Sequence, residues 1–158
     1  MQPRTGHKIV TENRKARHEY HILETFEAGL ALAGTEVKSL RLGRANLQDS
    51  YARVENNELL LYNMHVSPYD QGNRFNHEPK RKRKLLMHKR EIMRLLGKSR
   101  EKGLALIPLR VYFKNGYAKV ELALAKGKKT YDRREDMAAK DAKRDMDRAM
   151  KSSMQNYR

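Results

Sequence analysis

The residues of this sequence most suited to chemistry are cations grouped in short runs. The runs are NRKAR (13–17), KRKRK (80–84) and KGKK (126–129). Lys and Arg bind phosphate oxygens, and such contacts supply much of the affinity of proteins for nucleic acids. KRKRK comes before or opens an expected helix, where the helix dipole disfavours cations. We infer that this run serves binding; a solvated charge run without a role is the alternative.

Catalytic patterns are weak by comparison. HEYH (18–21) is similar to a zinc-protease signature, but its His residues are three positions apart instead of four and lie in a strand-like stretch, so the metal-binding helical face is missing. The sequence has no Gly-rich loop of Walker or dinucleotide type and no serine in a nucleophile-elbow context. Glu135 and Asp136 fall in a polar segment that cannot hold carboxylates in a fixed geometry. We therefore predict binding without catalysis, metal or cofactor.

The overall charge indicates a polyanionic partner. The 158 residues include 35 Lys and Arg against 19 Asp and Glu, which gives a net charge of +16. Nucleic acid is the first expectation. An anionic membrane is the rival, but membrane binding usually needs a basic amphipathic helix with bulky apolar anchors, and Trp is absent. A charged surface kept for solubility rarely needs so one-sided a balance.

Composition also indicates the cellular compartment. Cysteine is absent, which excludes disulfides, thiolate metal sites and thiol nucleophiles. The N-terminal MQPRTGHK has no apolar signal region, and apolar runs such as LALIPL are far shorter than a membrane span. We expect a cytoplasmic monomer with no membrane partner.

Strand-like runs with alternating polarity fill much of the chain. HEYHILETFEAGLAL (18–32) predicts a strand pair with a break near Glu27–Gly29. Two hairpins are expected, one turning at Asn56–Asn57 and one at Asn115–Gly116, because these residues tolerate the left-handed backbone of tight turns. Lys119 lies on the solvent face of the last strand. The tyrosines of the strands either fill the core, which we favour, or stack on splayed bases.

Two helices complete the expected fold. GTEVKSLRLG (34–43) has Thr35 as a predicted N-cap and Gly43 as a stop. LLMHKREIMRLLG (85–97) has apolar residues at helical spacing and Gly97 as a stop. The order of elements predicts a mainly β fold, a small closed or nearly closed OB-like β-barrel with short flanking helices.

The chain changes character after Leu124, since residues 125–158 contain no Leu, Ile, Val or Phe. Ala and Met recur at helical spacing there, but they bury little area, and an isolated helix of this length is marginal. We predict a flexible N-terminus (1–12), a nucleic-acid-binding barrel (13–124) and a basic tail (125–158). The tail is expected to be disordered when free and helical on an anionic surface.

Four stretches resemble the SsrA-binding proteins, the small protein B family of bacterial trans-translation. They are NRKARHEY, ETFEAGLALAGTEVKSLRLGRANLQDSY, RKLLMHKREIMRLLGK and AKGKKTYDRRE, and the likeness runs from about Asn13 to Glu135. The resemblance implies an OB-like closed β-barrel of about six strands that binds the tRNA-like domain of transfer-messenger RNA (tmRNA) without catalysis. It also implies delivery of that RNA to stalled ribosomes, with the small ribosomal subunit as a partner and elongation factor Tu in the delivery complex.

The resemblance also assigns residues. Motif matches place Glu27, Leu86 and Lys119 on the RNA-binding face. Together with the basic groups, the expected RNA-binding set is Asn13, Arg14, Lys15, Arg17, Glu27, Lys84, Leu86, Lys119, Lys126, Gly127, Lys128 and Lys129. In the tail, the residues expected to contact the ribosomal decoding centre are Tyr131, Asp132, Arg133 and Arg134. Tyr131 would stack on a base there while the tail probes the empty mRNA channel. The family commonly has Lys where this chain has Arg133, which alters the geometry of that contact.

Two other functions remain open from the residues themselves. A generic single-strand RNA-binding barrel or RNA chaperone would carry an equally high charge. A cryptic nuclease or other metal-dependent enzyme would depend on His18 or His21 for turnover. Competition between folded and unstructured RNA separates the first of these from the tmRNA adaptor, and an assay for RNA cleavage tests the second.

Overall fold

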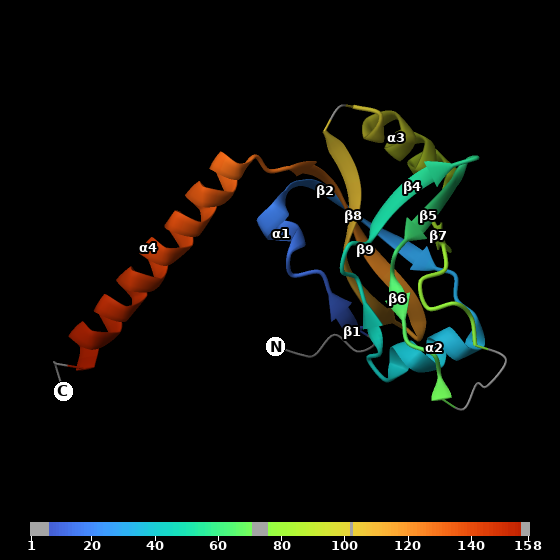
Figure 1. Cartoon of the computed structure of the whole chain (residues 1–158), viewed down its shortest axis with the longest axis horizontal. Coiled ribbons are helices and arrows are strands. Elements are labelled where there is room, and N and C mark those ends of the chain that lie inside the picture. Colours follow the sequence, from blue (N-terminus) through green and yellow to red (C-terminus); the bar gives the residue numbers. More distant parts are fainter. Residues whose placement is uncertain (1–6, 71–75, 102, 156–158) are drawn as a thin grey trace. The chain divides into compact units, whose positions relative to one another are not determined.

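The computed structural model describes residues 7–70, 76–101 and 103–155 (Figure 1). The elements in chain order are β1 (His7–Glu12), α1 (Ala16–Glu19), β2 (Tyr20–Leu30), α2 (Gly34–Arg41), β3 (Ala45–Asn46), β4 (Tyr51–Glu55), β5 (Glu58–Tyr62), β6 (His65–Val66), β7 (Arg83–Leu86), α3 (Lys89–Ser99), β8 (Leu104–Lys114), β9 (Tyr117–Gly127) and α4 (Thr130–Gln155). The chain divides into two compact units, Met1–Gly127 and Lys128–Arg158.

Six strands of the first unit, within the described residues, form a closed ring of hydrogen-bonded neighbours. Their order is β8-β4-β5-β7-β2-β9, and β9 pairs back to β8, while β1 adds a further strand to β8. The ring surrounds a core of buried aliphatic side chains that includes Leu59, Leu61, Leu85, Val120 and Leu122. The predicted mainly β fold with a few helices is confirmed.

Both predicted hairpins are present. β4 and β5 turn at Asn56 and Asn57, whose φ angles are 49° and 64°. β8 and β9 turn at Asn115 and Gly116, with φ angles of 52° and 84°. All four angles lie in the left-handed region that Asn and Gly adopt more readily than other residues, so the turn residues themselves identified these hairpins.

The predicted break in the first strand pair is wrong, because β2 is one continuous strand of 11 residues. It pairs with β9 as far as Gly29, and with β7 at Gly29 and Leu30. Gly29 serves close packing and does not mark a turn. A Cβ atom at this position would lie 3.2 Å from the Cβ atom of Leu86, closer than most such contacts.

The predicted helix over 85–97 is partly wrong. Leu85 and Leu86 belong to strand β7, where Leu85 is fully buried and Leu86 is half exposed. This strand fills the position between β5 and β2, and without it the ring would be open. The helix α3 begins only at Lys89 and continues through Gly97 to Ser99, so Gly97 is not a stop.

Helix α2 lies where the sequence predicts it, but its N-cap is Ala33 and not Thr35. The first turn is closed by Glu36, whose carboxylate accepts a hydrogen bond from the Ala33 main-chain N–H at 3.0 Å. Gly43 follows the helix with φ +73°, and its N–H donates to the Leu40 carbonyl, as expected of a C-terminal glycine.

Part of the N-terminal segment that the sequence predicts to be loose is a strand. His7–Glu12 forms β1, which pairs antiparallel with the C-terminal half of β8 from Lys114 to Arg110. This half of β8 is not paired with β4, so its open edge accepts a further strand. Residues 1–6 of the predicted flexible segment lie outside the described residues.

Candidate nucleic-acid interface

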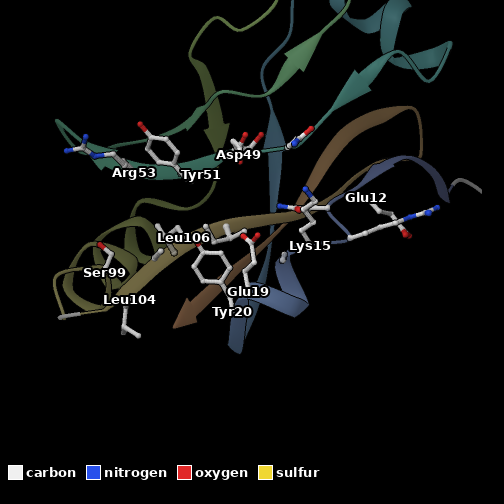
Figure 2. Close-up of a pocket in the computed structure, with 18 of the residues that line it drawn as sticks. Glu12, Lys15, Glu19, Tyr20, Asp49, Tyr51, Arg53, Ser99, Leu104 and Leu106 are labelled. Carbon is white, nitrogen blue, oxygen red and sulfur yellow. The ribbon is translucent and has the colours of Figure 1, made fainter. Parts of the chain in front are cut away.

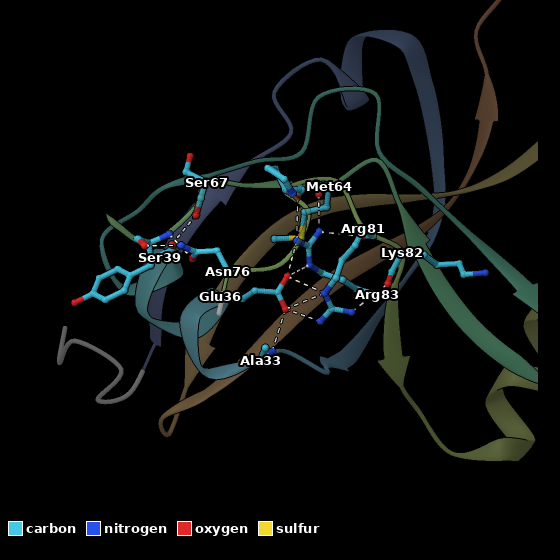
Figure 3. A network of polar contacts seen from close by, with 11 residues as sticks. Ala33, Glu36, Ser39, Met64, Ser67, Asn76, Arg81, Lys82 and Arg83 are labelled. Atoms are coloured by element: carbon cyan, nitrogen blue, oxygen red, sulfur yellow. Dashed lines mark hydrogen bonds and ion pairs between the residues drawn. The ribbon is translucent and has the colours of Figure 1, made fainter. Parts of the chain in front are cut away.

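The fold divides the KRKRK run into arginines that contact Glu36 and lysines that are exposed. Figure 3 shows Arg81 and Arg83 beside the Glu36 carboxylate. Arg83 is fully buried, and its guanidinium donates to the Glu36 carboxylate at 2.7 Å and to the Met64 carbonyl at 2.6 Å. Arg81 forms a second ion pair with Glu36 at 2.5 Å. The hypothesis that all five cations serve phosphate binding is therefore corrected, and Lys80, Lys82 and Lys84 are the exposed members of the run.

The buried carboxylate of Glu36 keeps its negative charge despite its surroundings. Burial alone would raise its pKa, but hydrogen bonds from Arg81, the Ala33 N–H and Arg83 outweigh burial and lower the pKa below its ordinary value. This network ties α2 to β7 and to the segment before it. Two cations of the basic run therefore hold the fold together.

Glu27, Leu86 and Lys119, which the motif matches single out, lie around one shallow hollow. Its volume is about 350 Å³, and Gly29, Met87, His88 and Glu91 also line it. The reason is strand order: Gly29 of β2 pairs with Leu86 of β7 on one side and with Lys119 of β9 on the other. Residues far apart in sequence thus meet on three adjacent strands.

Two residues of β8, Tyr112 and Lys114, contact the carboxylate on the polar side of this hollow. The Glu27 carboxylate accepts a hydrogen bond from the Tyr112 hydroxyl and lies 3.5 Å from the Lys114 ammonium. The hydrogen bond from Tyr112, supported by Lys114 and Lys119, lowers the pKa of Glu27 against the effect of burial. Burial and the Glu27 carboxylate raise the pKa of Tyr112, so this phenol stays protonated as a donor.

Glu27 faces a second carboxylate directly across the β2–β9 pair, that of Glu121. Like charges at opposed positions destabilise a sheet unless each has its own partner. Arg110 of β8 supplies a partner for Glu121 at 2.8 Å, and Lys114 of the same strand supplies one for Glu27. These cross-strand contacts fix the position of the Glu27 carboxylate.

The hollow combines three kinds of contact for a ligand. Leu86 is an apolar residue but is 52% exposed. Burial alternates along β7, so Leu86 lies on the exposed face together with Lys84, while Leu85 is buried. Lys119 provides a cation, and Glu27 provides an acceptor. An exposed apolar side chain between a cation and an acceptor suits a nucleotide, whose sugar and base are apolar on their faces and polar at their edges.

The N-terminal basic group lies at a different place. Asn13 has a structural role, since its main-chain N–H donates to the Leu109 carbonyl at 2.7 Å and its side-chain amide to the Pro108 carbonyl at 3.1 Å. Arg14 and Lys15 are exposed just before α1, and Arg17 is exposed within it. Asn13, Arg14 and Lys15 line a groove of about 780 Å³ that shares no lining residue with the Glu27 hollow (Figure 2).

The other expected RNA-binding residues are spread over both units. Lys84 is half exposed and lies 3.7 Å from Glu58. Lys126 and Gly127 are exposed at the end of β9. In the second unit, Lys128 forms an ion pair with Asp136, and the Lys129 carbonyl accepts the Arg133 N–H.

Two of the four expected decoding-centre residues can be placed in detail. Arg134 is exposed on α4 and Arg133 is partly buried. The side chains of Tyr131 and Asp132 lie outside the described part of the chain, so the expectation for them stays a prediction.

The metal-enzyme alternative gains no support from the structure. His18 lies in α1 and His21 in β2. Across residues 7–70, 76–101 and 103–155, no group of three or more His, Asp or Glu side chains could hold a metal ion. In the same residues no helix has the length and apolar character needed to cross a membrane.

Sequence reasoning missed the residues that support the hollow, chiefly Tyr112 and Lys114. Their signal was present in the stretch RVYFK (110–114), where Arg110, Tyr112 and Lys114 alternate with Val111 and Phe113. Such alternation puts the three polar side chains on one face of a strand. Only the pairing of β8 with β9, and of β9 with β2, shows that this face carries Glu27.

The fold and the site together define a class: a small, mainly β protein with a strongly basic exterior and a mixed polar and apolar hollow, the surface of a nucleic-acid-binding protein. The family model described as SmpB protein matches residues 10–152, and the chain belongs to the SmpB family.

Relatives agree with this assignment over nearly the whole chain. The SsrA-binding protein of Pelotomaculum thermopropionicum is 80% identical over 147 residues, which cover 93% of this chain and 96% of the relative. The SsrA-binding protein of Bacillus subtilis is 56% identical over 155 residues, covering 98% and 99%. A solved structure described as "tmRNA-SmpB: a journey to the center of the bacterial ribosome" matches with a TM-score of 0.65 at 59% identity, covering 76% of this chain and 85% of the other.

Proposed function

We propose that this protein is a non-catalytic RNA-binding adaptor of bacterial trans-translation. It binds the tRNA-like domain of tmRNA and delivers it to stalled ribosomes, where incomplete proteins are tagged. Membership of the SmpB family and the high identity to SsrA-binding proteins support this function. The similar solved structure joins tmRNA, SmpB and the ribosome in its description. The setting is the bacterial cytoplasm, and elongation factor Tu joins the delivery complex.

The observation that carries the proposal is the meeting of Glu27, Leu86 and Lys119 around one hollow. Lys119 binds a backbone phosphate. Leu86 packs against a ribose or base, and Glu27 accepts a hydrogen bond from a 2′-hydroxyl or a base N–H, the contacts by which proteins recognise folded RNA.

The remaining cations extend the proposed RNA contact. Five exposed cations of the first unit add phosphate contacts around the ring: Arg14, Lys15, Arg17, Lys84 and Lys126. We take this ring to be an OB-like barrel. The stretch from Gly127, the last residue of the first unit, to Arg134 leads into the tail. Its proposed contact is the decoding centre, through Tyr131, Asp132, Arg133 and Arg134. The tail is disordered when free and becomes helical in the empty mRNA channel.

The test measures affinity for the tRNA-like domain in full-length variants. Lys119→Gln is expected to weaken binding about threefold to tenfold and to reduce the slope of log affinity against log salt by about one, as for one lost phosphate contact. Leu86→Ala should weaken binding without changing that slope. Leu42→Ala is the control, because Leu42 is 57% exposed and lies outside the hollow.

The same assay separates the adaptor from a generic single-strand RNA-binding protein. Unstructured RNA at moderate salt should fail to displace the tRNA-like domain. Equal displacement by unstructured RNA, together with unchanged affinity in Lys119→Gln, would show that the hollow does not recognise folded RNA.

A further inference from the structure

A groove on the first unit lies where two strands of the ring, β4 and β8, share the shortest pairing. Within the described strands, β4 and β8 pair at one position, Ala52 with Leu106. Their backbones separate on either side of this pair, and the groove of about 780 Å³ opens beside it (Figure 2). Tyr51 and Arg53 lie on the wall formed by β4, and Tyr20 and Glu19 lie on the opposite wall.

A buried hydroxyl in the groove wall lacks a hydrogen bond. Ser50 is only 4% exposed, and its Oγ atom has no hydrogen-bond partner among the described residues. Its main-chain N–H donates to the Leu47 carbonyl at 3.0 Å, so the residue itself is held in place. A buried hydroxyl needs a hydrogen-bond partner, and in the wall of an open groove this partner is water or a polar atom of a ligand.

The aromatic wall of the groove is held in place by several contacts. The Tyr51 ring stacks on Tyr62, with 5.2 Å between ring centroids and 7° between planes. Tyr62 is fixed in turn, since its hydroxyl donates to Glu55 at 2.6 Å and the Lys82 ammonium lies 5.8 Å from its ring centroid. A pre-positioned ring beside an open groove offers a stacking platform at little entropic cost.

Charged groups of both signs surround this platform. Arg14, Lys15 and Arg53 supply cations for a phosphate, and Asp49 and Glu19 supply acceptors for base N–H groups. A ligand with a flat ring, N–H edges and an anionic group matches this set, and an unpaired nucleotide has all three.

We propose that the groove between β4, β8 and α1 binds one unpaired nucleotide of the RNA that this protein engages. The base stacks on Tyr51, the Ser50 hydroxyl bonds to the base or sugar, and the phosphate lies against Arg14, Lys15 and Arg53. This inference rests on the proposed RNA-binding function and adds a second contact, separate from the hollow at Glu27, Leu86 and Lys119. The nucleotide comes either from tmRNA or from ribosomal RNA.

The experiment compares the affinities of full-length variants for the tRNA-like domain and for purified small ribosomal subunits. Tyr51→Leu is expected to weaken one of the two about tenfold, whereas Tyr51→Phe, which keeps the ring, binds within about twofold of the unchanged protein. Ser50→Ala should weaken the same interaction about threefold, as for one lost hydrogen bond. Tyr69→Leu is the matched control, since it removes a tyrosine ring outside the groove.

The pattern of losses identifies the source of the nucleotide. If the variants lose affinity for the tRNA-like domain, the nucleotide belongs to tmRNA. If they lose affinity for the small subunit, the nucleotide belongs to ribosomal RNA. If Tyr51→Leu and Ser50→Ala bind both partners as well as the unchanged protein does, the groove inference is overturned while the proposed function stands. If the unchanged protein binds neither partner, the proposed function itself fails.

A second measurement does not depend on the folding of a variant. Amide resonances of the unchanged full-length protein are followed while each of the four nucleoside monophosphates is added. Saturable shifts centred on Ser50 and Tyr51 are expected. Shifts that never saturate, or that spread evenly over the exposed lysines, would contradict a nucleotide site in the groove.

Discussion

At the scale of single residues, a buried carboxylate determines what the basic run KRKRK does. Glu36 is 4% exposed and binds both Arg81 and Arg83, and Arg83 is completely buried. Removing one partner of such a pair leaves an uncompensated charge in the interior. The lysines between and beside these arginines remain exposed. One run therefore has both a structural and a surface role.

Glu36→Gln is expected to destabilise the protein by about 3–5 kcal/mol, because the amide cannot neutralise Arg83. Chemical denaturation measures the loss. The control is Glu58→Gln, whose half-exposed partner is Lys84, and which should cost less than about 1 kcal/mol. Adding Arg83→Met to Glu36→Gln should restore part of the stability, since no unpaired buried charge then remains. A double variant as unstable as the single one would contradict this account.

The lowered pKa of Glu36 also determines how the stability of the protein depends on pH. The pKa of Glu36 in the folded protein lies below its ordinary value of 4.5, so the unfolded chain takes up a proton more readily. The stability that Glu36 contributes is complete above about pH 4.5 and is lost as the pH falls through the lower, folded-state pKa. Denaturation at several pH values should therefore show a shallower acid decline in Glu36→Gln.

At the scale of elements, the strand order β7-β2-β9 brings the residues of the Glu27 hollow together. Gly29 has no side chain, so Leu86 can lie close to the β2 backbone. Gly29 pairs with both Leu86 and Lys119. It also lies inside β2, where sequence reasoning expects a break. A glycine in a strand can mark a turn, a bulge or a close approach, and the local sequence does not distinguish them.

Gly29→Ala is expected to displace Leu86, because the new methyl group would lie 3.2 Å from the Leu86 Cβ atom. We predict a destabilisation of about 1–3 kcal/mol and a several-fold loss of affinity for the tRNA-like domain. Gly34→Ala is the control, since a Cβ atom there meets nothing within 4 Å. Full affinity in folded Gly29→Ala would show that the position of Leu86 is not critical.

Helix α4 is the element least supported by packing. From Met137 to Met154 every residue is exposed, and a contact such as the 2.6 Å pair of Arg144 with Asp141 adds little at the surface. A peptide of residues 130–158 should therefore be mostly unstructured in dilute buffer by circular dichroism and gain helix in trifluoroethanol. A stable helix in buffer would count against a tail that orders only when bound.

At the scale of the whole molecule, the chain combines a packed unit and a second, helical unit, and the division falls after Gly127. Leu124, where the apolar sequence ends, is inside β9. Ala125 is fully buried and pairs with Ile22, so β9 needs the next residues to complete its pairing with β2.

Truncation after Gly127 should leave most of the affinity for the tRNA-like domain and abolish tagging on stalled ribosomes. The reason is that the strands around the Glu27 hollow remain intact while the tail is lost. Gel-shift and tagging assays measure the two effects. Truncation after Leu124 should also destabilise the fold, because it removes the end of β9. If the protein truncated after Gly127 still supports tagging, the tail is not required for the ribosomal step and the proposed separation of roles is wrong.

The sequence by itself determined the basic character of the protein, both hairpins, the helix at α2 and the family resemblance. Charge is a sum over residues, and turns such as Asn115–Gly116 depend on local backbone preferences. Tertiary structure decided the continuity of β2, the strand state of Leu85 and Leu86, the burial of Arg83 and the meeting of Glu27 with Lys119. Each of these depends on which strands become neighbours, and pairing between distant segments leaves no signal in local spacing.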